Sequence, residues 1–274
     1  MTTAPAPNTL APNTLAPNTL APTTLVGVDV GGSGVKAALV DLGTGQATGR
    51  VRVETPQPAT PDAVMSAVLG LVRQFPNRGT IGCTLPAVVA NGVVHTAAHI
   101  DPAWIGAHAA TLLSRATDRP SVVLNDADAA GVAEARFGAA RSRRGTVVMV
   151  TIGTGVGTAV LNDGVLVPNA ELGHIFVKRH LADTWVSDAT RMAETLSWKL
   201  WTRRLDRYLV QLHEILWPEL IVIGGGIVKH ADKFLDRIDP DCEVRIAELG
   251  NLAGIVGAAV AAAAHDPAAV AGRT

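Results

Sequence analysis

Residues 27–41 read GVDVGGSGVKAALVD, and the four glycines of this stretch fall within eight residues, directly after a short apolar run. Beyond Gly34, Val35 and Val40 bracket an alternating segment, a pattern that favours a strand over a helix. The stretch is therefore not a dinucleotide fingerprint, whose glycines lead into a helix. It is not a Walker A loop either, because no Gly-Lys-Ser/Thr follows at the required spacing. It predicts a hairpin of two strands, whose glycine turn exposes backbone N–H groups that can hold phosphoryl oxygens.

A second glycine loop repeats this layout. Residues 145–151 read GTVVMVT, a buried strand, and they lead into the loop GTGVG at 153–157 and a returning strand at Thr158–Leu161. A third glycine turn, at 224–226, follows the strand Leu220–Ile223 and would let a flat nucleotide approach the backbone. Because both halves of the chain open in the same way, we expect an α/β protein with two duplicated lobes around a central cleft. The two loops together favour phosphoryl transfer.

The glycine loops provide the candidate phosphate and nucleotide contacts. These are Gly31, Gly32, Ser33, Gly34, Lys36, Thr151, Gly153, Thr154, Gly155, Gly224, Gly225 and Gly226. Asp29 stands at the start of the first hairpin, where a carboxylate can bind a magnesium ion directly or through its waters. An ordinary tight hairpin with an Asp at the strand end is the alternative for the first loop taken alone.

The remaining elements follow from hydrophobic periodicity and turn residues. We expect further strands at Val51–Val53, Thr80–Thr84, Val88–Val94, Ser121–Asn125, Val165–Val167 and Glu243–Ala247. We expect helices at Pro61–Phe75, Ile105–Ala116, Ala127–Phe137, Ala193–Leu216 and Leu252–Ala264. The expected organisation is an N-terminal lobe at 25–124, joined by the helix at 252–264, and a C-terminal lobe at 125–251.

Composition excludes several classes of function. The 274 residues are 48% hydrophobic and 17% charged, as in a core-rich globular protein, and the net charge of −1 provides no field toward nucleic acid or acidic membrane. No apolar run approaches the roughly 20 residues that span a bilayer. Two distant cysteines, Cys83 and Cys242, make neither a disulfide framework nor a zinc cluster. We expect a cytoplasmic protein without nucleic-acid or membrane partners.

The amino terminus carries a five-residue repeat. Residues 6–25 read APNTL three times and then APTTL. Regular prolines block a continuous helix, so residues 1–24 are predicted to be a disordered Pro-rich tail. No Lys or Arg precedes Lys36, so the charged start of a secretory leader is not present in this stretch.

Five motifs together resemble the ROK-family sugar kinases, which belong to the actin-like, ribonuclease-H-like ATPase superfamily. The motifs are DVGGS at 29–33, ND at 125–126, TIGTG at 151–155, ELGH at 171–174 and IGGG at 223–226, and the resemblance covers Leu25 to Ala264. In most of the family a lysine directly follows the first motif, whereas Lys36 lies two residues further on, on the same strand face. This shift and residues 96–106, TAAHIDPAWIG, are similar to the polyphosphate glucokinases of actinobacteria.

The resemblance implies roles for four residues. Asp126 would be the catalytic base that takes the proton of the sugar 6-hydroxyl, and Asn125, Glu171 and His174 would bind the other hydroxyls. A helix cap is the alternative for Asn125 and Asp126, because both residue types favour that position. The implied reaction is transfer from polyphosphate, ATP or both to glucose, with mannose as a further candidate, and with magnesium as cofactor. A homodimer is expected from the family alone.

The chain also departs from the wider family. Many members have a CxCGxxGC zinc cluster after the matching histidine, but no cysteine follows His174 in residues 175–190, so we expect no zinc site. Other packing must then hold the turn at 171–174. His99 stands where the subgroup has Asn, near the expected sugar pocket. Two basic sets are candidates for a polyphosphate path, with solvated surfaces as the alternative: Arg136, Arg141, Arg143 and Arg144, and Lys199, Arg203, Arg204 and Arg207.

Two other functions stay open from the sequence. One is a sugar-binding ROK-type regulator without a DNA-binding domain, since the family contains repressors that carry a helix-turn-helix. The other is a different actin-like phosphotransferase acting on a small molecule, against which the motif at 171–174 argues.

Overall fold

The computed structural model describes residues 24–76, 79–98 and 100–266. The repeat at the amino terminus, apart from its last two residues, and His99 lie outside the described residues. Two five-stranded sheets form the framework, with the orders β3-β2-β1-β4-β7 and β10-β9-β8-β13-β14. In each sheet the first three strands are antiparallel and the last three run parallel. The prediction of two duplicated α/β lobes is confirmed.

The strands lie close to their predicted positions. In the N-terminal sheet they are β1 (Thr24–Gly31), β2 (Gly34–Asp41), β3 (Ala47–Val53), β4 (Ile81–Leu85) and β7 (Ser121–Asn125). In the C-terminal sheet they are β8 (Thr146–Ile152), β9 (Val156–Asn162), β10 (Val165–Val167), β13 (Leu220–Gly224) and β14 (Glu243–Ile246). Two small hairpins are formed by β5 (Val89–Ala90) with β6 (Val93–Val94) and by β11 (Phe176–Val177) with β12 (His180–Leu181).

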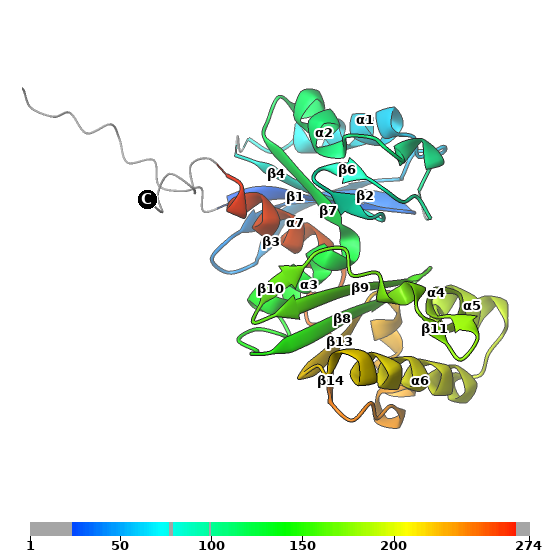
Figure 1. Cartoon of the computed structure of the whole chain (residues 1–274). Helices are drawn as coiled ribbons and strands as arrows, with labels where there is room; N and C mark the ends of the chain where they lie inside the picture. Colours follow the sequence, from blue (N-terminus) through cyan, green and yellow to red (C-terminus); the bar gives the residue numbers. More distant parts are fainter. Residues whose placement is uncertain (1–23, 77–78, 99, 267–274) are drawn as a thin grey trace, which may run out of the picture.

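Helices cover both faces of both sheets (Figure 1). They are α1 (Pro61–Val72), α2 (Ala109–Thr117), α3 (Asp126–Phe137), α4 (Ala182–Val186), α5 (Asp188–Ala193), α6 (Trp198–Leu216) and α7 (Ala253–Ala264). Short 3-10 turns lie at Pro102–Trp104, Leu172–His174, Gly226–Lys233, Leu235–Arg237 and Gly250–Leu252. Helices α1 and α2 pack on the outer face of the N-terminal sheet, and α6 packs on the outer face of the C-terminal sheet. Between the sheets, α7 covers β1 and β4, while α3 covers β8 and β9.

The two inner helices pack directly on each other and join the lobes through one hydrophobic core. Helix α7 lies so close to its neighbours that side chains are excluded at the crossings. A Cβ at Gly82 of β4 would collide with the carbonyl of Ala258, and a Cβ at Gly257 of α7 would collide with the carbonyl of Ala129 in α3. The helix predicted at 252–264 therefore lies against the first strands of the chain.

Three predicted helices differ from the observed ones, and the one expected at 61–75 ends at Val72. The helix expected at 105–116 begins at Ala109, because Gly106 takes a φ of +81° and donates its N–H to Val94. The helix expected at 193–216 begins at Trp198, as α6, and a turn in which Thr195 has a φ of +49° separates it from α5, which ends at Ala193. The side chain of Ser197 then caps α6 by accepting from the N–H of Leu200.

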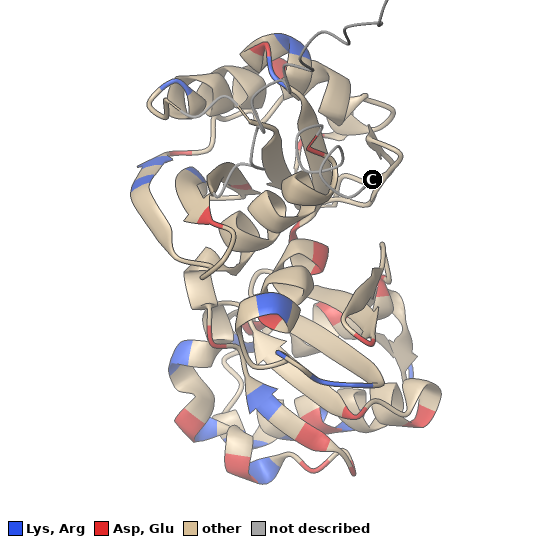
Figure 2. Cartoon of the chain, turned by 90° about the vertical axis from the view of Figure 1, so that its left-hand side faces the viewer, with Lys and Arg blue, Asp and Glu red and all other residues tan. Residues whose placement is uncertain are grey.

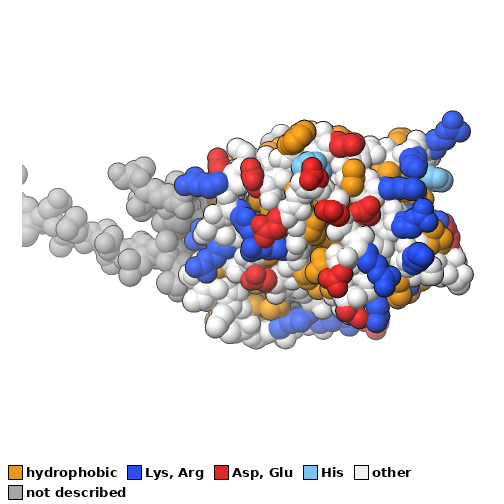
Figure 3. All heavy atoms as spheres, turned by 90° about the horizontal axis from the view of Figure 1, so that it is seen from below, with side chains coloured by type: hydrophobic (Ala, Val, Ile, Leu, Met, Phe, Trp, Pro, Cys, Tyr) orange, Lys and Arg blue, Asp and Glu red, His pale blue; other side chains and the backbone are white. Residues whose placement is uncertain are grey.

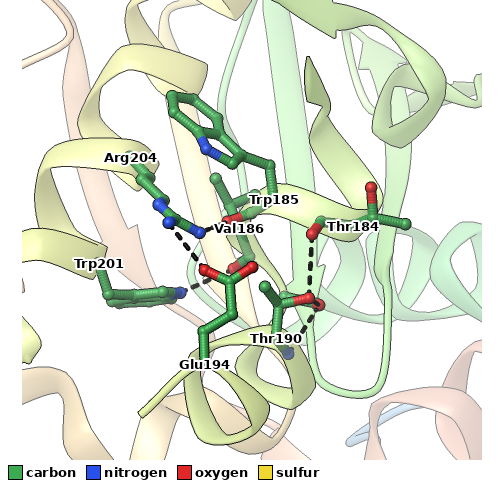
Figure 4. Close-up of polar contacts among 8 residues, drawn as sticks. Thr184, Trp185, Val186, Thr190, Glu194, Trp201 and Arg204 are labelled. Atoms are coloured by element: carbon green, nitrogen blue, oxygen red, sulfur yellow. Dashed lines mark hydrogen bonds and ion pairs between the residues drawn. The ribbon is translucent and has the colours of Figure 1, made fainter. Parts of the chain in front are cut away.

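Helix α6 holds α4 and α5 in place beside the C-terminal sheet (Figure 4). Trp201 donates its indole N–H to the carbonyl of Val186 at 2.9 Å. Arg204 donates to the carbonyl of Trp185 at 3.3 Å and to the carboxylate of Glu194 at 2.8 Å. Asp183 of α4 and Ala189 of α5 are in turn hydrogen-bonded to Val156 and Gly153 of the second glycine loop.

Charges of both signs are interspersed over the ribbon, with more of them on the C-terminal lobe (Figure 2). Among the residues that the structure describes, no helix is long and apolar enough to cross a membrane.

Candidate active site

A cavity of about 360 Å³ opens between the lobes, where the carboxyl ends of the parallel strands converge. Loops after β1, β4 and β7 line it from one side, and loops after β8 and β13 line it from the other. Eleven predicted residues contribute to its wall: Gly31, Gly32, Asn125, Asp126, Thr151, Gly153, Thr154, Gly155, Glu171, His174 and Gly225. The structure therefore brings the two glycine loops and the candidate sugar contacts to one place.

A smaller cavity of about 160 Å³ lies beside it and shares Asp126, Thr151 and Gly225 with the first. Asp29, Lys36 and Gly224 line only this second cavity. Three predicted contacts, Ser33, Gly34 and Gly226, line neither of the two cavities.

The first glycine loop is a two-residue turn, Gly32-Ser33, between the paired residues Gly31 and Gly34. The backbone N–H groups of Gly32 and Ser33 donate to no other described residue. A Cβ on Gly32 would meet no atom within 4 Å, so neither packing nor a left-handed φ requires glycine there. The bare turn leaves room and free donors for an anion.

The second loop has fewer free donors than its sequence suggests. The N–H of Gly153 donates to the carbonyl of Gly155 at 2.9 Å, and the N–H of Val156 donates to the carboxylate of Asp183 at 2.6 Å. Within the described part of the chain, the N–H groups of Thr154 and Gly155 have no acceptor. They are the donors that this loop can offer to a phosphoryl group.

Asn125 is the N-cap of α3. Its Oδ1 accepts from the N–H groups of Ala127 and Asp128, at 2.8 and 3.1 Å, and its Nδ2 donates to the carbonyl of Ala87 at 3.1 Å. The cap anticipated from the sequence is therefore present at Asn125. One Nδ2 hydrogen is left for a ligand, because a primary amide has two.

Asp126 follows at the first position of α3, beside both cavities. Burial raises the pKa of Asp126 to about 7, and the negative charges of Asp29 and Glu171 act in the same direction. A hydrogen bond from the N–H of Ala127, at 2.9 Å, opposes this rise in pKa only in part. A carboxyl group with a pKa near neutrality is suited to accept a proton from a hydroxyl group.

Near Asp126, a network of hydrogen bonds connects α3 to both lobes. The Oδ2 of Asp128 accepts from the N–H of Asn169 at 2.8 Å. The Asn169 side chain makes two bonds to the backbone of Val89, at 3.1 and 3.0 Å. Residues on the two sides of the cavity are thus joined a short distance from Glu171.

Glu171 and His174 lie on one 3-10 turn, with 3.9 Å between Oε2 and Nδ1. Thr158 of β9 fixes this turn from below, because its hydroxyl donates to the carbonyl of Ala170 and accepts from the N–H of Leu172 at 2.9 Å. Gly173 lies so close to the carbonyl of Val156 that a side chain would collide with it. The sequence did not indicate which residue holds this turn in place. In the structure that residue is Thr158. Within the described residues, no group of three or more His, Cys, Asp or Glu side chains could hold a metal ion.

Asp29 lies between two partners. Its Oδ1 accepts from the hydroxyl of Thr84, and its Oδ2 from the ammonium of Lys36, both at 2.9 Å. Each carboxylate oxygen retains a further lone pair. A magnesium ion keeps several waters and uses one or two carboxylates together with substrate phosphates. The residues around Asp29 fit an ion held in that way.

The third glycine turn lies against the second loop. Gly225 has a φ of +83°, and a Cβ there would press on the backbone of Ile152. Glycine is required at this position because a side chain could take neither the angle nor the space.

Asp183 and Thr158 are the site residues that the sequence analysis missed. Asp183 lines the main cavity and holds the second loop through Val156, while Thr158 flanks Glu171 from an adjacent strand. No local motif marks either residue. The sequence placed Thr158 at the start of the strand predicted at 158–161, but gave no indication of its partners.

The two basic sets proposed for polyphosphate lie on outer surfaces. Arg143 pairs with Glu243 at 2.5 Å, and Arg204 pairs with Glu194. Lys199, Arg203 and Arg207 are exposed on α6. Figure 3 shows the outer face of the C-terminal lobe, where Lys and Arg side chains gather toward one end with acidic side chains among them. None of these residues lines either cavity.

Comparison with known proteins identifies relatives along nearly the whole chain. The family model described as "ROK family" matches residues 25–183. A polyphosphate glucokinase of Mycobacterium tuberculosis (strain CDC 1551 / Oshkosh) is 43% identical over 240 residues, which are 87% of this chain and 91% of the relative.

Solved structures agree with this match. The inorganic polyphosphate/ATP-glucomannokinase of Arthrobacter sp. strain KM superposes with a TM-score of 0.86 at 44% identity, over 89% of this chain and all of that one. A ROK family glucokinase from Streptomyces griseus, in complex with glucose and AMPPNP, has a TM-score of 0.73 at 24% identity, over 86% of this chain and 98% of that one. At that identity the second match shows the fold alone.

Proposed function

The chain belongs to the ROK family, and on that premise we propose that it is a hexose kinase which transfers a phosphoryl group from inorganic polyphosphate or ATP to the 6-hydroxyl of glucose. The observation that carries this proposal is Asp126, a carboxyl group with a pKa of about 7 between two glycine loops that present free N–H groups. Relatives more than 40% identical that cover most of the chain are kinases, which favours this function over a sugar-binding regulator.

In the proposed reaction, Asp126 accepts the proton of the attacking hydroxyl group. Glu171 and His174, with the remaining Nδ2 hydrogen of Asn125, bind other hydroxyls and orient the sugar toward Asp126. In this arrangement the sugar lies in the main cavity beside Glu171, and the phosphoryl donor binds at the glycine loops.

The N–H groups of Gly32, Ser33, Thr154 and Gly155, which donate to no described residue, would hold the phosphoryl oxygens as charge builds up on them. Lys36 stands next to this position and adds a positive charge. The proposal includes magnesium at Asp29, held through water; the ion would neutralise charge on the donor phosphates. Gly224–Gly226 would receive the adenosine when ATP is the donor.

Three finer points are also part of the proposal. Mannose is a second acceptor, supported by the name of the Arthrobacter glucomannokinase. A cytoplasmic location and a homodimer are expected from the family, and size-exclusion chromatography with light scattering would test the dimer.

The experiment that tests the function is a coupled assay crossing two donors, polyphosphate and ATP, with glucose, mannose, fructose and N-acetylglucosamine. We expect transfer to glucose with at least one donor, and formation of the 6-phosphate as seen by NMR of the product. An enzyme that transfers no phosphoryl group to any of the hexoses would contradict the kinase function. Binding of a hexose without turnover, measured by calorimetry, would instead support a regulator.

A further inference from the structure

One row of polar side chains crosses the N-terminal sheet beside the smaller cavity. The strand register pairs Thr84 with Asp29, Asp29 with Lys36, and Lys36 with Arg52. Directly paired residues of neighbouring strands point to the same face of a sheet. Arg52 of β3 is therefore the outermost member of the row that begins beside the candidate base.

Arg52 is held in place by backbone. Its Nη2 donates to the carbonyl of Ser33 at 2.8 Å. Its guanidinium lies over Gly34, so that a Cβ on Gly34 would lie 2.6 Å from Nε. Gly34 lines neither cavity, and the space it leaves is filled by Arg52 instead. The guanidinium thus rests on the tip of the first glycine turn.

The charge of Arg52 is not neutralised within the described residues. Arg143, Arg191 and Arg204 each form an ion pair with a carboxylate. Arg52 forms no ion pair with any described residue and is exposed. An arginine fixed at one N–H with its other donors free is suited to bind an oxyanion.

The spacing of the residues in this row indicates which kind of oxyanion Arg52 would bind. Neighbouring strands lie about 4.8 Å apart, so the row extends roughly 10 Å from Asp29 to Arg52. A donor phosphate beside Lys36 would have Arg52 one strand further out. A polyphosphate chain continues with a charged phosphate at each step, whereas ATP has only three phosphates before its uncharged nucleoside.

We propose that Arg52 binds phosphoryl groups of polyphosphate beyond the reacting one, and that it favours polyphosphate over ATP. This inference rests on the proposed function, since it assigns a donor-selecting residue to the same site. Neither of the basic sets chosen from the sequence includes it, because its position depends on the register of β2 and β3.

The test compares Arg52→Gln with a control, Arg115→Gln, which removes the same charge from an exposed side chain of α2 on the outer face of the sheet. We expect Arg52→Gln to lower kcat/KM for long-chain polyphosphate about tenfold and to change kcat/KM for ATP less than twofold. The KM for glucose should stay at its wild-type value. The Arg115→Gln variant should keep wild-type kinetics with both donors, because α2 covers the opposite face of the sheet.

Binding adds a readout that does not depend on turnover. Calorimetric titration with long-chain polyphosphate should give a weaker Kd and a shallower salt dependence for Arg52→Gln than for the wild type, because a charge contact with a polyanion is lost. Arg52→Lys should restore part of the affinity.

Equal losses with ATP and polyphosphate would mean that Arg52 only supports the hairpin, and would overturn the inference. Unchanged kinetics and binding with polyphosphate would overturn it as well. A wild-type protein that phosphorylates no hexose contradicts the proposed function instead, and in that case the polyphosphate titration still decides the role of Arg52.

Discussion

Asp126 is the residue on which the proposed chemistry depends most. We expect Asp126→Asn to lower kcat by about a hundredfold or more, since an amide cannot accept the proton and general base catalysis typically contributes 10²–10⁴-fold. Glucose binding, measured by calorimetry, should remain close to wild type. Because the base must be deprotonated, kcat/KM of the wild type should rise with pH up to about 7 and then level off. Wild-type turnover in the variant would show that another group takes the proton.

The same carboxyl group should make the fold less stable at high pH. Its pKa is raised in the folded state, so the folded protein binds more protons than the unfolded chain between about pH 4 and pH 7. Stability from this group is therefore present below pH 4 and is lost as the pH rises through 7. At pH 8 the Asp126→Asn variant should melt at least about 2 °C above wild type, a shift that corresponds to roughly 1 kcal/mol. An equal or lower melting temperature would contradict this.

Thr158 should act on the sugar through Glu171. Replacing Thr158 by Val removes the hydroxyl that bonds on both sides of Glu171 and leaves the N–H of Leu172 without its acceptor. We expect KM for glucose to rise about tenfold, while KM for the donor changes little. Thr158→Ser keeps the hydroxyl and should behave as wild type. If the serine variant loses glucose affinity to the same extent, the effect comes from packing rather than from the hydrogen bonds.

Individual residues show what the sequence could and could not predict. The glycine loops were identified because their spacing is local, and Asp126 because the ND motif at 125–126 resembles the ROK-family sugar kinases. Asp183 and Thr158 were missed because their role arises from strands and helices that meet only in the fold. The ion pair between Lys36 and Asp29 likewise depends on strand register. The roles of the site residues in binding and catalysis stay predictions.

Among the elements, α7 has the tightest packing. Gly82→Ala places a methyl group against the backbone carbonyl of Ala258, and neither β4 nor α7 can move without disturbing the inner core. We expect a loss of about 3 kcal/mol in the free energy of unfolding, measured by urea denaturation.

Gly70→Ala provides the control for this substitution. Gly70 lies inside α1, and a Cβ there would meet no atom within 4 Å. Alanine is the better helix former, so this variant should gain about 0.5–1 kcal/mol. Equal effects of the two substitutions would mean that α7 does not lie as close to β4 as described.

Element boundaries were predicted least well where a helix begins. Residues 194–197 carry on the helical spacing of apolar residues, so the sequence predicts one long helix at 193–216. The chain turns there instead, because Ser197 caps α6 and Arg204 donates a hydrogen bond to the carboxylate of Glu194. The Ser197 cap is local and the ion pair of Arg204 is tertiary, and the periodicity of apolar residues reports neither.

At the scale of the whole molecule, the described residues that line the main cavity run from Gly31 to Gly225. The sequence predicts residues 1–24 to be a disordered Pro-rich tail, so we expect the reaction not to depend on them. We expect removal of residues 1–22, which leaves β1 intact, to keep kcat and KM for both substrates within twofold of wild type. A coupled assay on the shortened and full-length chains would measure this, and a large loss of activity would show that the repeat takes part in the reaction.

The position of α7 also determines when each lobe can be completed during translation. Strand β1 is made among the first residues of the chain, but the helix that covers it is formed by residues 253–264. While the ribosome is still adding the C-terminal lobe, one apolar face of the N-terminal sheet remains uncovered. The N-terminal half therefore stays incomplete, with an apolar face that favours aggregation, until residues 253–264 have been made. The lobe that is made first is the one that is completed last.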